Sequence, residues 1–237
     1  MSTEWSPPRN RLGGKHLLVL AAMPDADRSR TADAIETEEA VMSLVRAIVG
    51  NGGRVTLIAP SSLALLAAVV AGEFATPQLE ESRERPEALI TVVITDTEGL
   101  DGAFEHLSTI GYVSARTGDK GKALRDLAGR ADALVCAGDG SVEEVEAFQK
   151  ARSTRAPVFA LAAPQGGSTA LAEVPGVIVA DWQVSREAPL FDDMRRDEFD
   201  RELEAPALPP LALAAQWIVE RLIARPSEDD SRTTRGR

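Results

Sequence analysis

Cysteine, histidine and aromatic residues are scarce in this chain of 237 residues, with one cysteine, two histidines and 4% aromatics. The single Cys136 excludes an internal disulfide, and we expect it to be a small buried thiol in a strand. His16 and His106 lie far apart without cysteine partners, so the spacing of a zinc site is absent. Neither a Ser-His-Asp nor a Cys-His arrangement can be assembled from these positions.

Long hydrophobic runs are also missing. The longest strictly apolar run, residues 63–71, is about half the length needed to cross a bilayer. The polar, proline-containing start of the chain lacks the apolar region of a signal peptide. We therefore expect a cytoplasmic protein with no membrane segment, and the 44% of hydrophobic residues is enough for a sizeable core.

Basic residues are outnumbered by acidic ones, at 26 against 37, which gives a formal net charge of −11. A general nucleic-acid binder normally carries a basic face, and this balance opposes such binding. Three aspartates, Asp25, Asp27 and Asp33, suggest a divalent cation, but a solvated acidic loop with Asp33 capping a helix explains them more simply. We predict no metal and no general nucleic-acid partner.

Short apolar runs typical of buried strands alternate with helical patterns along the chain. This order predicts an α/β fold, a Rossmann-like doubly wound and mainly parallel sheet with helices on both faces and a C-terminal helical extension. The expected strands are 16–21, 54–59, 89–95, 110–113, 134–136, 157–161 and 177–180. The expected helices are 31–49, 61–72, 99–108, 120–130, one from Ser141, 191–203 and one from Leu211. The apolar face of the first helix includes Ile35, and residues 50–53 are its expected stop. Residues 76–86 are an expected charged connection.

We divide the chain into a flexible leader (1–14), an α/β domain (15–180), a C-terminal helical extension (181–225) and a disordered tail (226–237). In the extension, apolar residues recur at helical spacing beside a tryptophan. Such a stripe normally packs on the parent domain. The alternative is a homodimer through the helix 211–223.

A glycine turn joins a buried strand to a helix within residues 133–148. Gly138 and Gly140 give a path without side chains that brings backbone amides near a ligand. The helix that Ser141 opens favours anions at its N-terminus. Because Ser141 and Glu144 also form a capping box, the turn alone does not separate a phosphate site from a helix cap.

Two further loops follow expected strands. Gly166, Gly167 and Ser168 come after the strand 157–161, so two neighbouring strands end in small-residue loops at the edge where such sheets bind ligands. Pro60 and Ser61 open a helix after the second strand and could bind an anion there, with a hydroxyl N-cap as the alternative.

The combined pattern resembles the SLOG superfamily. This Rossmann-like group includes the Lonely Guy phosphoribohydrolases, DprA-type proteins and the nucleotide-sensing domains of some bacterial defence proteins and TRPM channels. Its Gly-Gly-x-Gly-Thr-x-Glu-Glu motif falls on residues 137–144, where the matching positions are Gly138, Gly140, Glu143 and Glu144. Alanine and serine replace the first glycine and the threonine, and both changes are conservative in size.

The resemblance extends over roughly residues 15–180. A strand ending in a small-residue turn with proline looks like residues 17–24. The family's Thr-Gly-Gly-x-Ala loop is similar to 165–170, where Gln165 replaces the threonine. A Gly-Gly-His-Pro loop of close relatives aligns with 57–60, where only Pro60 matches, and Leu57 and Ile58 fit strand core better than a ligand loop.

The resemblance implies binding of a nucleotide or nucleotide-derived molecule, by the sensor or accessory component of a bacterial signalling or defence system, with no required cofactor. The expected ligand-binding residues are Pro24, Pro60, Ser61, Gly138, Asp139, Gly140, Ser141, Gly166, Gly167 and Ser168.

Two alternatives stay open. A Lonely Guy-like enzyme would hydrolyse the N-glycosidic bond of a nucleoside monophosphate, and the resemblance then implies Glu143, Glu144 and Arg125 as catalytic residues. The helix segment 120–125 does not reproduce the family's Arg-Lys pattern in register, so the sequence favours binding over catalysis. The altered loop at 57–60 favours a third interpretation, a scaffold with a vestigial pocket.

Overall fold

The computed structural model contains one seven-stranded sheet in the order β4-β3-β2-β1-β5-β6-β7. Every pair of neighbouring strands is parallel. The structure describes residues 10–22, 32–82, 90–95, 113–116, 119–138, 142–151, 156–161, 169–180 and 210–224.

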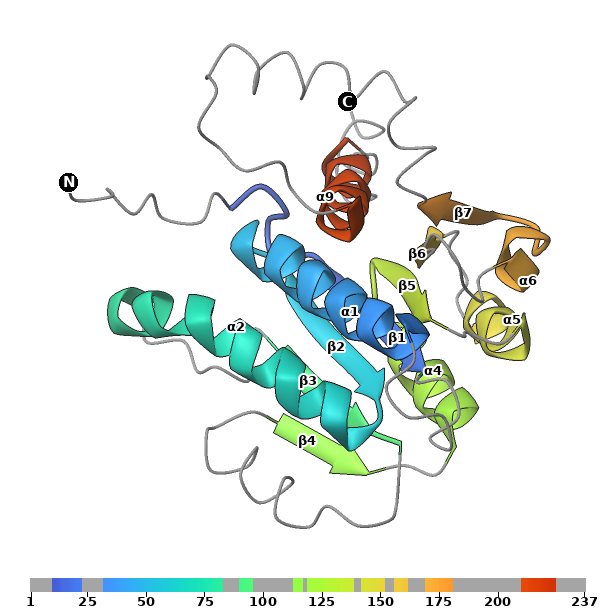
Figure 1. Cartoon of the computed structure of the whole chain (residues 1–237), viewed down its shortest axis with the longest axis horizontal. Coiled ribbons are helices and arrows are strands. Elements are labelled where there is room, and N and C mark those ends of the chain that lie inside the picture. The colour runs from blue at the N-terminus through green and yellow to red at the C-terminus, as the bar shows by residue number, and fades with distance from the viewer. Residues whose placement is uncertain are drawn as a thin grey trace, which may run out of the picture.

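The sheet and its helices alternate along the chain (Figure 1). The strands are β1 (His16–Ala22), β2 (Arg54–Ala59), β3 (Ile90–Ile94), β4 (Val113–Arg116), β5 (Ala133–Gly138), β6 (Val158–Leu161) and β7 (Val177–Ala180). The helices are α1 (Ala32–Gly50), α2 (Ser61–Ser82), α4 (Lys120–Ala128), α5 (Val142–Ala151), α6 (Thr169–Ala172) and α9 (Pro210–Ile223). The predicted doubly wound parallel α/β fold is confirmed.

Helices cover both faces of the sheet, and each face has its own core. Alternate residues of β1 point to opposite faces, so Leu17 and Val19 join the core under α1, α2 and α9. Leu18 and Leu20 join the core under α4, α5 and α6. Because both faces are covered, the central strands are continuous apolar runs, as the sequence predicted.

Helix α2 does not end at Gly72, the end predicted from the sequence, but continues to Ser82. The part of 76–86 expected as a charged connection is therefore helical up to this residue. Gly72 costs about 1 kcal/mol relative to alanine inside a helix and Pro77 about 3 kcal/mol. The buried turns of α2 before Gly72 lie in the core, and tertiary packing of this kind outweighs local propensity.

Two other predictions are wrong in detail. The strand expected at 110–113 is β4, Val113–Arg116, which among the described strands pairs with β3 alone, at the sheet edge, and lacks an apolar run. Ile35, expected on the apolar face of α1, is 52% exposed. It lies two helical turns before Met42, on a side of α1 that differs from the side of the fully buried residues. The expected helices 99–108 and 191–203 and the tail 226–237 lie outside the described residues.

Residues 10–14, assigned above to the flexible leader, are held against the fold. Leu12 is buried, and its N–H donates to the Asn51 carbonyl at 2.8 Å. The Arg11 guanidinium donates two bonds, of 2.5 and 2.8 Å, to the Glu220 carboxylate on α9. This segment therefore ties the α1–β2 turn to the C-terminal helix.

Helix α9 packs on the domain, as the first interpretation of its apolar stripe predicted. The stripe joins the core beneath α1, through Leu211, Ala215, Ile218 and Leu222. The side chain of Trp217 is also buried and meets the Phe159 ring edge-on, with 6.4 Å between ring centroids. A homodimer through helix 211–223 stays a prediction. Such a dimer would have to form through the part of the α9 surface that is not packed on the domain.

The turn after α1 closes the helix as a Schellman motif. Gly53 donates its N–H to the Ile48 carbonyl and Gly52 donates to the Val49 carbonyl, both at 2.9 Å. Gly52 has a φ of +76°, which favours glycine. The sequence predicted this stop at residues 50–53.

We expect Gly53→Ala to lower the free energy of unfolding by about 1–3 kcal/mol, the usual cost of overpacking a core. A β-carbon at this position would lie 2.7 Å from the Leu12 Cδ1 and 2.8 Å from the Ile48 Cγ2. Gly129→Ala is the matched control, since nothing lies within 4 Å of its added carbon. Urea denaturation of both variants is the measurement, and equal stabilities would contradict the close packing of Leu12.

Candidate functional site

The order of the strands reverses at β1. From β1 the chain continues through α1 to β2 on one side, whereas β5, on the other side of β1, continues through α5 to β6. Helices α1 and α5 lie on opposite faces of the sheet (Figure 1). In doubly wound sheets, ligands bind outside the carboxyl ends of the strands at such a switch point.

The described candidate residues gather at this edge of the sheet. Gly138 ends β5 in register with Ala22, the last residue of β1. Pro60 and Ser61 follow the end of neighbouring β2. Seven other predicted ligand-binding residues lie outside the described residues, namely Pro24, Asp139, Gly140, Ser141, Gly166, Gly167 and Ser168.

The two glycine loops leave neighbouring strands. Leu134 pairs with Val158 and Ala137 with Leu161 in a parallel register, which confirms the predicted adjacency of β5 and β6. The carboxyl ends of parallel strands meet at one edge, so the segments that follow Gly138 and Leu161 both begin there. At β2, Leu57 and Ile58 are fully buried strand residues, as their sequence indicated.

Glu143 and Glu144 both lie in the first turn of α5, but their surroundings differ. Glu143 is exposed, whereas Glu144 is half-buried. Burial raises the pKa of the Cys136 thiol to about 12, and the charge of Glu144 adds to this shift. Glu144 therefore lies toward the end of β5, and Glu143 lies on the outer side of the helix.

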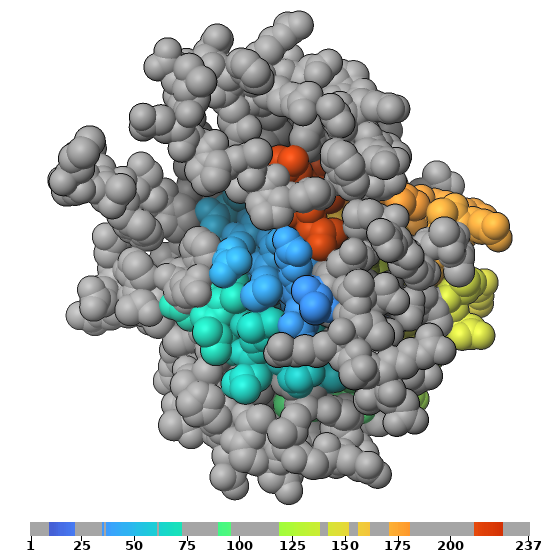
Figure 2. Space-filling model, viewed as in Figure 1, coloured from blue at the N-terminus to red at the C-terminus, as the bar shows by residue number. Residues whose placement is uncertain are grey.

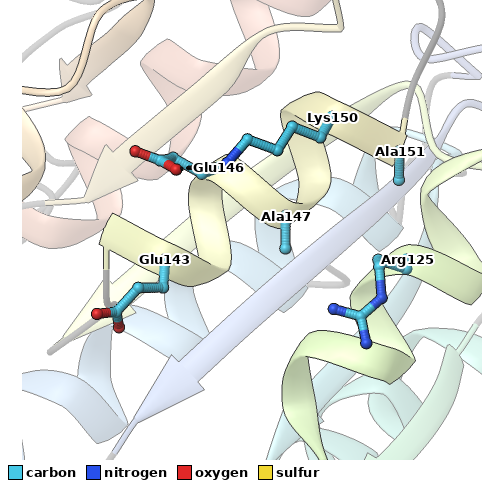
Figure 3. A pocket seen from close by; sticks show the side chains of 6 residues that line it. All are labelled: Arg125, Glu143, Glu146, Ala147, Lys150 and Ala151. Atoms are coloured by element: carbon cyan, nitrogen blue, oxygen red, sulfur yellow. Dashed lines mark hydrogen bonds and ion pairs between the residues drawn. The ribbon is translucent and has the colours of Figure 1, made fainter.

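A shallow hollow of about 410 Å³ lies between α4 and α5. Its lining residues are Arg125, Glu143, Glu146, Ala147, Lys150 and Ala151. Figure 3 shows Glu143 near the start of α5, with Arg125 across from Ala147 and Ala151. Arg125 and Glu143 thus line the same hollow but lie toward its opposite ends.

Arg125 also faces the start of its own helix. Its Nη2 lies 4.0 Å from the Asp119 Oδ2, in a pair whose side chains are both more than half exposed. Asp119 is the N-cap of α4, and its Oδ1 accepts the Lys122 N–H at 2.8 Å. This cap was not predicted from the sequence, although an aspartate directly before a helical pattern is its usual signal. Arg125 and Glu143 line one hollow, and Glu144 is not among its lining residues.

His16 has a structural environment at the opposite, amino edge of the sheet. Its Nδ1 lies 3.1 Å from the Arg130 carbonyl oxygen, and its Nε2 lies 2.7 Å from the buried Thr56 Oγ1. Within the described residues, no three His, Cys, Asp or Glu side chains are grouped to hold a metal ion. None of the described helices is both long and apolar enough to span a membrane.

We expect Cys136 to make the protein less stable at high pH. The thiol is 1% exposed, and its pKa of about 12 exceeds the ordinary value of 9.0. Above pH 9 the unfolded thiol loses its proton while the folded one keeps it, so alkali favours unfolding. Relative to Cys136→Ala, wild-type stability should fall by about 1 kcal/mol per pH unit above pH 9. Urea denaturation from pH 7 to about pH 11 measures this difference, and parallel pH profiles would contradict it.

No protein-family model matches the chain, and a search of curated proteins finds no match. Among solved structures, TM1055, a structural genomics target, aligns at 18% identity and a TM-score of 0.39, over 67% of this chain and 79% of that chain. A mitochondrial ornithine carbamoyltransferase from Coccidioides immitis aligns at 12% identity and 0.25, over 92% and 86%. Aspartate transcarbamoylase from Trypanosoma cruzi aligns at 10% and 0.24, over 88% and 83%. Similarities this weak support no functional argument. The fold assignment rests on the order and pairing of the strands.

Proposed function

We propose that the chain binds a nucleotide or nucleotide-derived small molecule at the carboxyl edge of the sheet, between β1 and β5. The observation that carries this proposal is the switch point, where Ala22 and Gly138 end neighbouring strands side by side. Helix α5 begins shortly after Gly138, and the N-terminus of a helix offers unpaired N–H groups to an anion. The SLOG-like glycine motif spans this turn.

The acidic first turn of α5 limits the charge of the ligand. Glu143 and Glu144 offset the partial positive charge of the helix N-terminus. They repel a polyphosphate, and they can accept hydrogen bonds from the hydroxyls of a ribose. The site therefore suits a nucleoside or a nucleoside monophosphate better than a triphosphate.

The role that follows is that of a sensor or accessory component in a bacterial signalling or defence system, and this part rests on the family resemblance alone. Binding would be the output of such a domain. No cofactor is needed for it.

A Lonely Guy-like hydrolase is the second candidate, because Arg125 and Glu143 line one hollow. Hydrolysis needs groups that hold the phosphate and the reacting sugar at the same time. The separation of Arg125 from Glu143 along the hollow favours binding without efficient turnover (Figure 3). Release of free base from nucleoside monophosphates that stops in Glu144→Gln would instead establish the enzyme.

Native mass spectrometry of protein purified without added nucleotide tests the proposal, because it reports a co-purified ligand directly. Calorimetry with nucleosides and nucleoside mono-, di- and triphosphates then ranks the ligands. We expect a monophosphate or nucleoside to bind more tightly than a triphosphate. A ligand-free protein that binds no member of this panel would favour the scaffold interpretation.

A further inference from the structure

The hollow between α4 and α5 lies on the surface, on the face of the sheet that these two helices cover. One of its lining residues, Arg125, comes from α4, and the others come from α5. Figure 2 shows side chains of α5 (yellow) on the surface at the right margin of the molecule. The volume of about 410 Å³ is within the range of small-molecule sites, about 300–1,000 Å³.

The middle of the hollow is lined by alanine. Ala147 and Ala151 follow Glu143 at intervals of four residues, so all three lie on one side of α5. Each interval spans about 6 Å along the helix. Since Arg125 lies across from the two alanines (Figure 3), a ligand that reaches from Glu143 to Arg125 spans about 6–12 Å along α5.

The charged side chains of the hollow leave one group of each sign available to a ligand. Lys150 and Glu146 are paired at 2.7 Å and neutralise one another. Glu143 is exposed and makes no ion pair or hydrogen bond with the part of the chain that the structure describes. Arg125 lies 4.0 Å from Asp119, and both side chains are more than half exposed. Exposed pairs of this kind contribute little stability, so the guanidinium can bind a further carboxylate.

We propose that this hollow binds a short peptide of two or three residues with free ends. The terminal ammonium pairs with the Glu143 carboxylate. The terminal carboxylate accepts hydrogen bonds from the Arg125 guanidinium, whose planar fork matches it. An extended chain spans at most about 3.6 Å per residue, so two or three residues cover about 7–11 Å. This length matches the separation of the two groups.

Ligands with charges of one sign fit this hollow less well. A phosphate bound to Arg125 would be repelled by Glu143, and a polyamine bound to Glu143 would be repelled by Arg125. A single amino acid has both charges, but they are too close together to reach both side chains at once. A short peptide with free ends carries opposite charges at the required spacing.

Titration of the full chain with trialanine, followed by NMR, tests the proposal. We expect the amide signals of Ala147 and Ala151 to shift with a Kd below about 1 mM. Trialanine that is acetylated at its amino end or amidated at its carboxyl end lacks one terminal charge. Each blocked peptide should bind at least about tenfold more weakly, because it loses one charge-assisted contact.

Two variants assign each end of the peptide to its side chain. Glu143→Gln should no longer distinguish trialanine from the acetylated peptide, and Arg125→Gln should no longer distinguish it from the amidated one. Lys122→Gln is the matched control, since Lys122 is an exposed cation of α4 that does not line the hollow. It should bind trialanine like the wild type.

The proposal is overturned if trialanine does not bind at up to about 10 mM, or if both blocked peptides bind as tightly as trialanine does. Neither result bears on the proposed nucleotide site, because calorimetry with nucleosides and nucleotides measures that site without any peptide present.

Discussion

Replacing Phe159 with alanine should lower the free energy of unfolding by about 3–5 kcal/mol, the cost of removing a large aromatic side chain from a packed core. Phe159 is fully buried in β6. Its ring meets the Trp217 ring at 88°, so it joins the sheet to the C-terminal helix. Urea denaturation, followed by the loss of helical circular dichroism, measures the effect.

Trp217→Phe is the matched control for this loss. The buried Trp217 Nε1 has no hydrogen-bond partner in the described part of the chain, and such an unpaired donor costs about 1–3 kcal/mol. Phenylalanine removes the donor and keeps an aromatic ring facing Phe159, so the net change should stay below about 1.5 kcal/mol. Equal, large losses in both variants would mean that the indole itself, rather than aromatic packing, holds α9 in place.

The strands could be predicted from the sequence because burial on both faces leaves a simple signal. Residues 54–59 and 177–180 were predicted with the bounds that the structure gives. The edge strand β4 carries no such signal, since half of Val113–Arg116 is polar. Its place beyond β3 follows from pairing between distant segments, which local patterns do not record.

Long-range packing also explains the other differences. Leu12 belongs to a segment that looks like a polar leader, and only its contacts with the α1–β2 turn place it in the core. Helix α2 continues beyond Gly72 because its earlier turns are packed in the core. Local propensity does not predict either contact, because both depend on tertiary packing.

The candidate site was predicted in part. The strand-to-helix turn placed Gly138 and the two glutamates at the carboxyl edge, because every β-strand of a parallel sheet ends there. The sequence could not distinguish Glu144, which lies toward Cys136, from the outward Glu143. That difference depends on how α5 is rotated against the sheet.

The largest functional effect should come from Gly140→Val, which we expect to lower nucleotide affinity at least about 100-fold. Gly140 lies outside the described residues, so this prediction rests on the glycine motif and on its flanking elements, β5 and α5. A branched side chain would fill the space beside the backbone amides that a phosphate needs. Calorimetry with a nucleoside monophosphate measures the loss, and circular dichroism verifies the fold.

Ser141→Ala separates the phosphate site from the helix cap at the same turn. If Ser141 mainly caps α5, its loss costs on the order of 1 kcal/mol of stability and leaves most of the affinity. We then expect Gly140→Val to lower the affinity, and Ser141→Ala to lower the stability measured by urea denaturation. If a folded Gly140→Val protein keeps its affinity, no phosphate depends on the amides that follow Gly138. The turn would then be purely structural, and the ligand site would lie away from the junction of β1 and β5.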